Sequence, residues 1–440
     1  MLRVFRKRAG SGRRIGAAFF CFLFIHLITA AAFVPVASAN TAGAAPQPLS
    51  LAAESAILID FETGQVLYEK NADMLLPPAS MVKMMTEYLV LEAISQNRIG
   101  WDSVVTISRH AAATGGSGIR LAEGHRYTVK DLFRHMSINS SNPASVALAE
   151  YVGGTEENFV AMMNAKGREF GLSDGFIFIN STGLPEDNGD ENLFTARDAA
   201  ILARRLIRDH PEILEFSSIP RATERESDPN SQTMDNWNRM LEGWKDFNNY
   251  FSAWAYEGLD GLKTGHTDAA GWCFTGTAVR DGVRLISVVM RTGSEEERFE
   301  ETRKLLDYGF NNFERQVVLV AKSSVEPLTE VEISKGKETK VAVVAETGVE
   351  LIVPKGTTAE NFVITAEAVP EDQRVAPIEA GQKLGTATIT YAGPNAGMYE
   401  PITINLIAAQ DVEKAGWFKL LLRAIGKFFG ELFGAVKNLF

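Results

Sequence analysis

Apolar residues follow helical spacing through the middle of this chain and form strand-like runs on either side. Residues 81–213 show near-helical periodicity, which predicts a largely helical block. Before it, residues 56–68 are typical of a hairpin that turns near Gly64. After it, apolar runs within 261–290 predict further sheet, so strands flank the helices at both ends.

After the helical block, the sequence predicts a hairpin turn and a further helix. Arg280-Asp281-Gly282 separates two apolar runs and predicts a tight hairpin. Residues 295–312 then predict a helix, whose core stripe is Phe299, Leu305, Leu306 and Phe310. Strands from both chain ends with helices inserted between them predict an α/β fold with an antiparallel sheet and helices on its faces.

The pattern changes after about Val317, where short strands are separated by Gly, Pro and Lys. We expect strands at 331–333, 340–344, 349–353, 362–365 and 386–390. They predict a small all-β domain that carries no catalytic motif.

The last segment, 412–440, predicts an amphipathic helix. Its polar stripe repeats every four residues and consists of Lys419, Arg423, Lys427 and Glu431. The opposite side carries Trp417, Leu421, Ile425, Phe428, Phe429, Leu432, Val436 and Leu439. Charges interrupt it too often for a spanning helix, so we expect it to lie in a membrane interface. A helix docked on the β domain, or a coiled pair, is the alternative.

The amino terminus is typical of a secretory signal peptide. Six basic residues precede an apolar run over 15–36, and Ala37-Ser38-Ala39 offers a cleavage site. Uncleaved, the segment would be a membrane anchor. We therefore predict a signal peptide (1–39), a linker (40–52), a catalytic domain (53–316), an all-β domain (317–410) and an amphipathic helix (411–440).

Composition and charge narrow the function classes. With 45% hydrophobic and 22% charged residues the chain is globular, and 440 residues are too many for one core. Loss of the six basic residues of 1–39 leaves 38 Lys and Arg against 55 Asp and Glu, a formal charge of −17. So acidic a protein is not expected to bind nucleic acid.

Cysteines and histidines point away from disulfide and metal chemistry. Cys21 leaves with the signal peptide, so Cys273 remains alone and is expected to be buried in a strand. There is no His-Glu-x-x-His motif and no Gly-rich phosphate loop. We expect no metal and no cofactor.

Ser80 and Lys83 form the first chemical motif. Pro77-Pro78 stops the preceding segment, so Ser80 is predicted to open a buried helix, with its hydroxyl at the positive end of the helix dipole. Lys83 follows one turn later on the same face, where its amine can act as the base. Burial and a neighbouring cation such as Lys263 would lower its pKa. The alternative is a helix-capping Ser80 and a solvated Lys83.

Two further polar motifs follow in order. Ser140-Ser141-Asn142 lies in a predicted loop between two helices, where Ser140 is placed as a proton relay beside Lys83 and Asn142 as an amide that binds substrate. An ordinary turn is the alternative. Lys263-Thr264-Gly265 starts a predicted edge strand, to which an extended peptide can add. Lys263 and Thr264 would hold its carboxylate, and Gly265 allows close backbone approach.

These motifs, Ser80-x-x-Lys83, Ser140-x-Asn142 and Lys263-Thr264-Gly265, resemble those of the penicillin-recognising serine enzymes. Within that superfamily the chain is similar to low-molecular-mass penicillin-binding proteins, the serine-type D-alanyl-D-alanine carboxypeptidases of Gram-positive bacteria. Further similar segments are 79–86, 164–166, 181–184, 236–238 and 260–265. The resemblance covers nearly the whole chain, while residues 245–256 depart from the family pattern by being longer and more aromatic.

The resemblance implies a role for each residue. Ser80 would be the acylated nucleophile and Lys83 its base, with Ser140 and Asn142 completing the proton and substrate network. Lys263 and Thr264 would bind the terminal carboxylate, and the backbone N–H groups of Ser80 and His266 would form the oxyanion hole.

The implied substrate is a peptidoglycan stem peptide at the outer face of the cytoplasmic membrane, and β-lactams would acylate the same serine. Carboxypeptidase, endopeptidase and transpeptidase activities share this acyl-enzyme. A β-lactamase is one alternative, although no Leu-Asn pair of a class A glutamate motif occurs. A non-catalytic wall-binding scaffold is the other.

Overall fold

The computed structural model describes residues 48–224, 231–247 and 249–437, so the predicted signal peptide and most of the linker lie outside the described residues. Five antiparallel strands form the first sheet in the order β2-β1-β9-β8-β7. They are β1 (Ser55–Asp60), β2 (Val66–Lys70), β7 (Leu259–Thr267), β8 (Gly271–Arg280) and β9 (Val283–Thr292). Strands from both sides of the helical block thus meet in one sheet, and β7 forms its edge.

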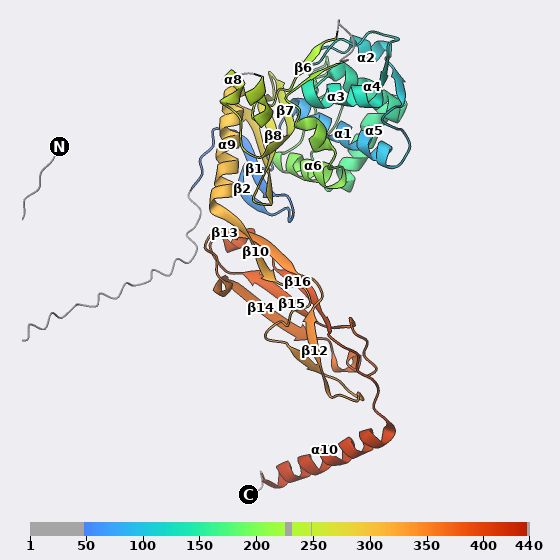
Figure 1. The fold of residues 1–440 in the computed structure, drawn as a ribbon, viewed down its shortest axis with the longest axis vertical. Helices are drawn as coiled ribbons and strands as arrows, with labels where there is room; N and C mark the ends of the chain where they lie inside the picture. Colours follow the sequence, from blue (N-terminus) through green and yellow to red (C-terminus); the bar gives the residue numbers. More distant parts are fainter. Residues whose placement is uncertain (1–47, 225–230, 248, 438–440) are drawn as a thin grey trace, which may run out of the picture. The chain divides into compact units, whose positions relative to one another are not determined.

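Helices cover both faces of this sheet (Figure 1). They are α1 (Lys83–Ser95), α2 (Arg109–Ala113), α3 (Val129–Asn139), α4 (Asn142–Gly153), α5 (Glu156–Glu169), α6 (Ala196–Asp209), α7 (Ile213–Ser217), α8 (Asn249–Ser252) and α9 (Glu295–Asn312). Because side chains alternate along a strand, Ile57 packs in the core shared with α1 and α6, whereas Leu58 packs in the core shared with α9. The predicted α/β fold with helices on both sheet faces is confirmed.

Local signals explain several element ends. Thr128 and Asp131 form a capping box at the start of α3, and the Ser141 side chain caps α4. Asp281 and Gly282 take positive φ angles of 49° and 77° in the predicted β8–β9 hairpin, as a tight two-residue turn requires. The pairs β3 (Val104–Thr106) with β4 (Arg126–Thr128) and β5 (Arg221–Thr223) with β6 (Thr233–Asp235) were not predicted, since three residues carry too little pattern.

The carboxy-terminal half contains the predicted all-β fold. One sheet has the order β11-β12-β16-β15-β14, and β10 pairs with β13. The strands are β10 (Phe313–Leu319), β11 (Glu330–Glu332), β12 (Lys340–Ala345), β13 (Val349–Pro354), β14 (Phe362–Ala368), β15 (Lys383–Tyr391) and β16 (Ile402–Ala408). The five expected strands are present, and β10 and β16 are additional. The boundary predicted at Val317 falls inside β10, and the domain limits stay a prediction.

Short 3-10 helices complete the chain, namely η1 (Ala79–Val82), η2 (Glu242–Asp246), η3 (Ala359–Asn361), η4 (Glu371–Gln373) and η5 (Ala396–Met398). The predicted terminal helix is α10 (Trp417–Lys437), and most of its apolar side chains between Trp417 and Phe429 are exposed, with Trp417 at 77% and Phe428 at 62%. Among the described residues, no helix combines the length and apolar character needed to cross a membrane.

Candidate active site

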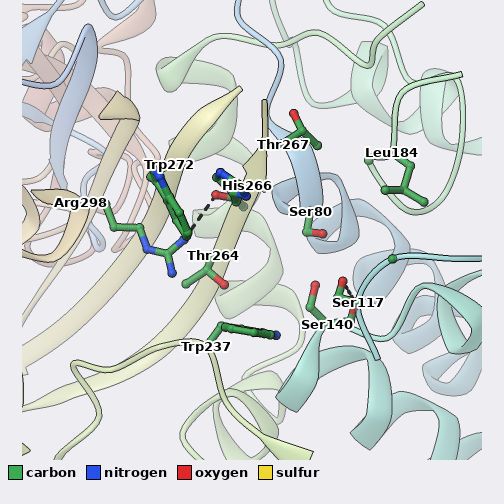
Figure 2. Close-up of a pocket in the computed structure, with 13 residues that line it drawn as sticks. Ser80, Ser117, Ser140, Leu184, Trp237, Thr264, His266, Thr267, Trp272 and Arg298 are labelled. Carbon is green, nitrogen blue, oxygen red and sulfur yellow. Dashed lines mark hydrogen bonds between the residues drawn. The ribbon is translucent and has the colours of Figure 1, made fainter. Parts of the chain in front are cut away.

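A cavity of about 260 Å³ brings the three predicted motifs together (Figure 2). Its walls come from η1, the α3–α4 junction, the edge strand β7 and the loop that follows α2. The lining residues are Ser80, Gly116, Ser117, Ser140, Gly183, Leu184, Trp237, Thr264, Gly265, His266, Thr267, Trp272 and Arg298. Ser80, Ser140, Thr264, Gly265 and His266 were all predicted from sequence.

Ser80 lies in the turn of η1 that precedes α1. Ala79 takes a left-handed backbone conformation, with φ of 49°, immediately before it. The residues at the capping positions, Pro78 and Val82, make no side-chain cap. The 3-10 turn η1 runs directly into α1, so the predicted helix is present with Ser80 in its opening turn, and the alternative of a helix-capping Ser80 is wrong.

Lys83 is completely buried, so the alternative of a solvated lysine is also wrong. Its Nζ lies 2.9 Å from Ser80 Oγ, 2.7 Å from Asn142 Oδ1 and 2.7 Å from the Thr182 carbonyl oxygen. The Asn142 amide is oriented by its Nδ2, which donates to the Gly115 carbonyl at 2.9 Å. Asn142 Oδ1 and the Thr182 carbonyl oxygen can therefore only accept hydrogen bonds, whereas the Ser80 hydroxyl can accept or donate one.

Three acceptors around Nζ suit an ammonium, which would donate to all of them, and also a neutral amine. A free amine has two N–H bonds, which Asn142 and Thr182 accept, and one lone pair, which then faces the Ser80 hydroxyl. Burial, and after it the charge of Lys263, lowers the pKa of Lys83 well below its usual range. Lys83 is thus arranged to take the proton of Ser80.

Ser140 lines the cavity, and the buried Lys263 lies behind it. Ser140 ends α3 with a left-handed φ of 61°, and its hydroxyl accepts from Lys263 Nζ at 2.9 Å. Lys263 also donates to the Thr264 carbonyl at 3.1 Å. Burial lowers the pKa of Lys263 to about 8. The sequence placed Ser140 beside Lys83, whereas the hydrogen bond of its hydroxyl in the structure is to Lys263 of the third motif.

Gly265 allows β7 to approach η1 closely, as the sequence predicted for its backbone. A Cβ at this position would lie 2.4 Å from the Pro78 carbonyl oxygen. The neighbouring His266 ring stacks on Trp272 with centroids 3.7 Å apart. Burial, followed by the charge of Arg298, lowers the pKa of His266, so the imidazole is neutral at physiological pH.

Arg298 and Trp237 were missed by the sequence reasoning. Arg298, in the first turns of α9, is 2% exposed; its guanidinium donates to the Gly265 carbonyl at 3.4 Å and lies 4.9 Å from the Trp272 ring centroid. Trp237 is 42% exposed and its indole N–H donates to the Asn139 carbonyl at 3.2 Å. Sequence periodicity assigned Arg298 only to a helix, because nothing local indicates that this helix end reaches β7.

Other expectations concern the surroundings of the cavity. The aromatic segment 245–256 contributes no lining residue among the described part of the chain, and its Tyr256 is buried and donates to Asp307 at 2.8 Å. Cys273 is a buried free thiol, as predicted, and burial raises its pKa to about 11. Within the described ranges, no group of three or more His, Cys, Asp or Glu side chains is placed to hold a metal ion.

Comparisons with known proteins agree with this geometry. Residues 40–294 match a family model described as D-alanyl-D-alanine carboxypeptidase, and residues 313–414 match one described as penicillin-binding protein 5, C-terminal domain. The chain is 34% identical to D-alanyl-D-alanine carboxypeptidase DacF of Bacillus subtilis, over 90% of this chain and 94% of the relative. It is 32% identical to DacC of Escherichia coli, again over 90% and 94%.

Solved structures give the same result. Penicillin-binding protein 5 from Haemophilus influenzae superposes with a TM-score of 0.68 at 31% identity, covering 83% of this chain and 99% of that one. Penicillin-binding protein D2 from Listeria monocytogenes, in a cefotaxime-bound form, superposes with a TM-score of 0.52 at 36% identity, covering 60% and 99%.

Proposed function

Because the chain belongs to the D-alanyl-D-alanine carboxypeptidase family, we propose that it hydrolyses the terminal D-Ala-D-Ala bond of peptidoglycan stem pentapeptides through an acyl-enzyme on Ser80. The observation that carries this proposal is the buried Lys83, whose Nζ lies 2.9 Å from Ser80 Oγ and whose pKa burial lowers well below its usual range. A serine next to an unprotonated, enclosed base is an activated nucleophile. The reaction needs no metal and no cofactor.

Acylation begins when Lys83 Nζ takes the Ser80 proton and Oγ attacks the penultimate D-Ala carbonyl. The oxyanion forms beside the backbone N–H groups of Ser80 and His266, as the family resemblance implies. As the C–N bond breaks, a proton passes to the leaving nitrogen from Lys83, with Ser140 as the relay next to Lys263. Free D-alanine departs, and an ester remains on Ser80.

Substrate binding depends on the edge strand and its cations. The peptide adds to β7. The predicted contact of Asn142 with the substrate amide does not fit the structure, because this side chain is buried with its Oδ1 on Lys83 and its Nδ2 on the Gly115 carbonyl; it orients Lys83 instead. Thr264 offers a hydroxyl to the terminal carboxylate, while Lys263 and the buried Arg298 supply positive charge from the same wall. Deacylation follows when water, deprotonated by Lys83, attacks the ester and regenerates the Ser80 hydroxyl.

A β-lactam presents a carboxylate and a strained amide in the same relation, so it should acylate Ser80 and form a long-lived adduct. Intact-protein mass spectrometry after incubation with penicillin tests this on the wild type, on Ser80→Ala and on Ser95→Ala, which removes an exposed hydroxyl from the end of α1. We expect an adduct on all but Ser80→Ala. An adduct on Ser80→Ala would refute the nucleophile, and rapid turnover without an adduct would indicate a β-lactamase.

The activity itself is tested by release of D-alanine from a synthetic pentapeptide that ends in D-Ala-D-Ala. We expect release by the wild type and none by Ser80→Ala. Absence of release from a wild-type protein that penicillin acylates would favour an endopeptidase or transpeptidase, and absence of both release and acylation would favour the non-catalytic scaffold.

The same proposal includes a location outside the cytoplasm. The Arg-rich, apolar segment 1–39 supports export, and the exposed apolar side chains of α10 support peripheral attachment to the membrane. Co-sedimentation with anionic lipid vesicles, comparing the chain from residue 40 with the same chain ending at Gly416, tests the second point. Equal binding by both chains would refute attachment through α10.

A further inference from the structure

Glu87 is a buried carboxyl group that the proposed reaction does not use. Its side chain is 1% exposed, and among the described residues its Oε1 has no hydrogen-bond partner. A buried carboxyl group with one oxygen unpaired destabilises the folded state, because part of its hydration is lost without replacement. Its presence so close to the candidate active site therefore calls for a functional reason.

Glu87 interacts electrostatically with two lysines of the site, Lys83 and Lys263. It follows Lys83 by four residues on α1, so both side chains lie on one face of that helix. Lys263 reaches the same interior from β7, and its exposed fraction is 3%. Lys83, Glu87 and Lys263 thus form a cluster of three buried ionisable groups.

The charges in this cluster influence one another. Burial raises the pKa of Glu87 to about 7, whereas Lys263, the Ser137 hydroxyl of α3 and Lys83 act to lower it. Glu87 in turn raises the pKa of Lys263, while Arg298 lowers it. The carboxylate of Glu87 and the ammonium of Lys263 therefore stabilise each other's charged form in the protein interior.

We propose that Glu87 is a positioning residue of the proposed reaction: its buried carboxylate is the counter-charge that keeps Lys263 cationic, while Lys83 one turn away remains a free amine. Lys263 needs its protons because it donates to Ser140 and to the Thr264 carbonyl. A charged Lys263 also discourages protonation of Lys83. This inference rests on the proposed acylation of Ser80 and adds the group that sets its charge state.

The test is the pH profile of the second-order rate constant for acylation by a fluorescent penicillin, from about pH 5 to about pH 10. Glu87→Gln keeps the shape of the side chain and removes the charge. We expect the alkaline limb, where Lys263 loses its proton, to move to lower pH by about one unit or more. The acid limb should move less, since Glu87 is itself protonated there.

Two variants control for structural effects. Glu87→Asp retains the carboxylate and should restore most of the wild-type profile. Glu92→Gln removes a charge from the same helix, where Glu92 pairs with Lys166 at 2.7 Å, and should leave both limbs in place. A uniform loss of rate in Glu87→Gln with unshifted limbs would overturn the proposal, because a purely structural role has that outcome.

If Glu87→Gln does not fold, a second variant tests the same inference. Ser137→Ala removes a group that favours the ionised carboxylate, so the alkaline limb should shift in the same direction by a smaller amount. An unshifted limb would contradict the inference.

If penicillin does not acylate the wild type, the proposed function is refuted, but the inference about Glu87 can still be tested. NMR titration of isotope-labelled lysine side chains then reports whether Glu87→Gln lowers the pKa of Lys263, and an unchanged pKa would overturn the inference.

Discussion

Gly183→Ala should damage the nucleophile without touching any catalytic side chain. Gly183 has a φ of 84°, and a Cβ there would lie 2.0 Å from the Ala79 carbonyl oxygen and 3.0 Å from Ser80 N. The preceding residue, Thr182, supplies the carbonyl that accepts from Lys83. The added methyl group therefore presses on the backbone that positions both Ser80 and its base.

The magnitude follows from two separate costs. A left-handed conformation costs a residue with a Cβ about 1–2 kcal/mol, and overpacking a tight site costs about 1–3 kcal/mol. Together they predict a loss of about 2–5 kcal/mol, which lowers Tm by about 5–15 °C in a domain of this size. Ordinary contact needs at least 3.4 Å, so the turn must move by more than 1 Å. Misplacement on that scale costs about 100-fold in rate.

Gly189→Ala is the matched control. Gly189 has a φ of 87°, but no atom lies within 4 Å of its added Cβ. It should lose only the conformational cost of about 1–2 kcal/mol and acylate at the wild-type rate. Thermal unfolding and fluorescent-penicillin kinetics on both variants separate the two costs. Acylation by Gly183→Ala within about threefold of Gly189→Ala, well below the 100-fold loss expected from misplacement, would refute the reasoning.

Three further predictions concern single side chains. Lys83→Arg should acylate about 1,000-fold more slowly in the same assay, because a guanidinium stays protonated and cannot take the Ser80 proton; a near-normal rate would exclude Lys83 as the base. Trp237→Ala should remove an apolar wall beside Ser140 and raise kcat/KM for peptides that end in a bulkier D-residue relative to D-Ala by about 10-fold, and an unchanged ratio would show that the indole does not select the leaving residue. Cys273 should react with a thiol reagent only after denaturation, since it is buried with a pKa raised to about 11; rapid reaction in the native protein would contradict its burial.

The elements that sequence predicted well are those with complete local signals. The helix predicted over 295–312 coincides with α9, and the turn residues Asp281 and Gly282 fixed the β8–β9 hairpin. The strands β10 and β16 were missed. Half of β10 faces outward, so its apolar pattern is weak, and both strands depend on pairing with β13 and β15 for their burial.

The candidate site likewise has features that the sequence predicts and features that it does not. The types and order of its residues are readable from sequence, because Ser80 and Lys83 are one turn apart and each motif marks the end of a predicted element. Their hydrogen-bond partners could not be predicted from the sequence, because those partners are far away along the chain. Lys83 is separated from Asn142 and Thr182 by 59 and 99 residues, and Lys263 is separated from Ser140 by 123.

The sequence by itself determined which segments become helices and hairpins and which side chains carry the chemistry. Backbone preference and side-chain periodicity act over a few residues and need no distant partner. Only the tertiary structure decided that Lys83 is enclosed with a lowered pKa, that Arg298 lies beside β7 and that Glu87 is buried together with Lys83 and Lys263. Protonation and burial depend on every group packed around an atom, and those groups come from remote parts of the chain.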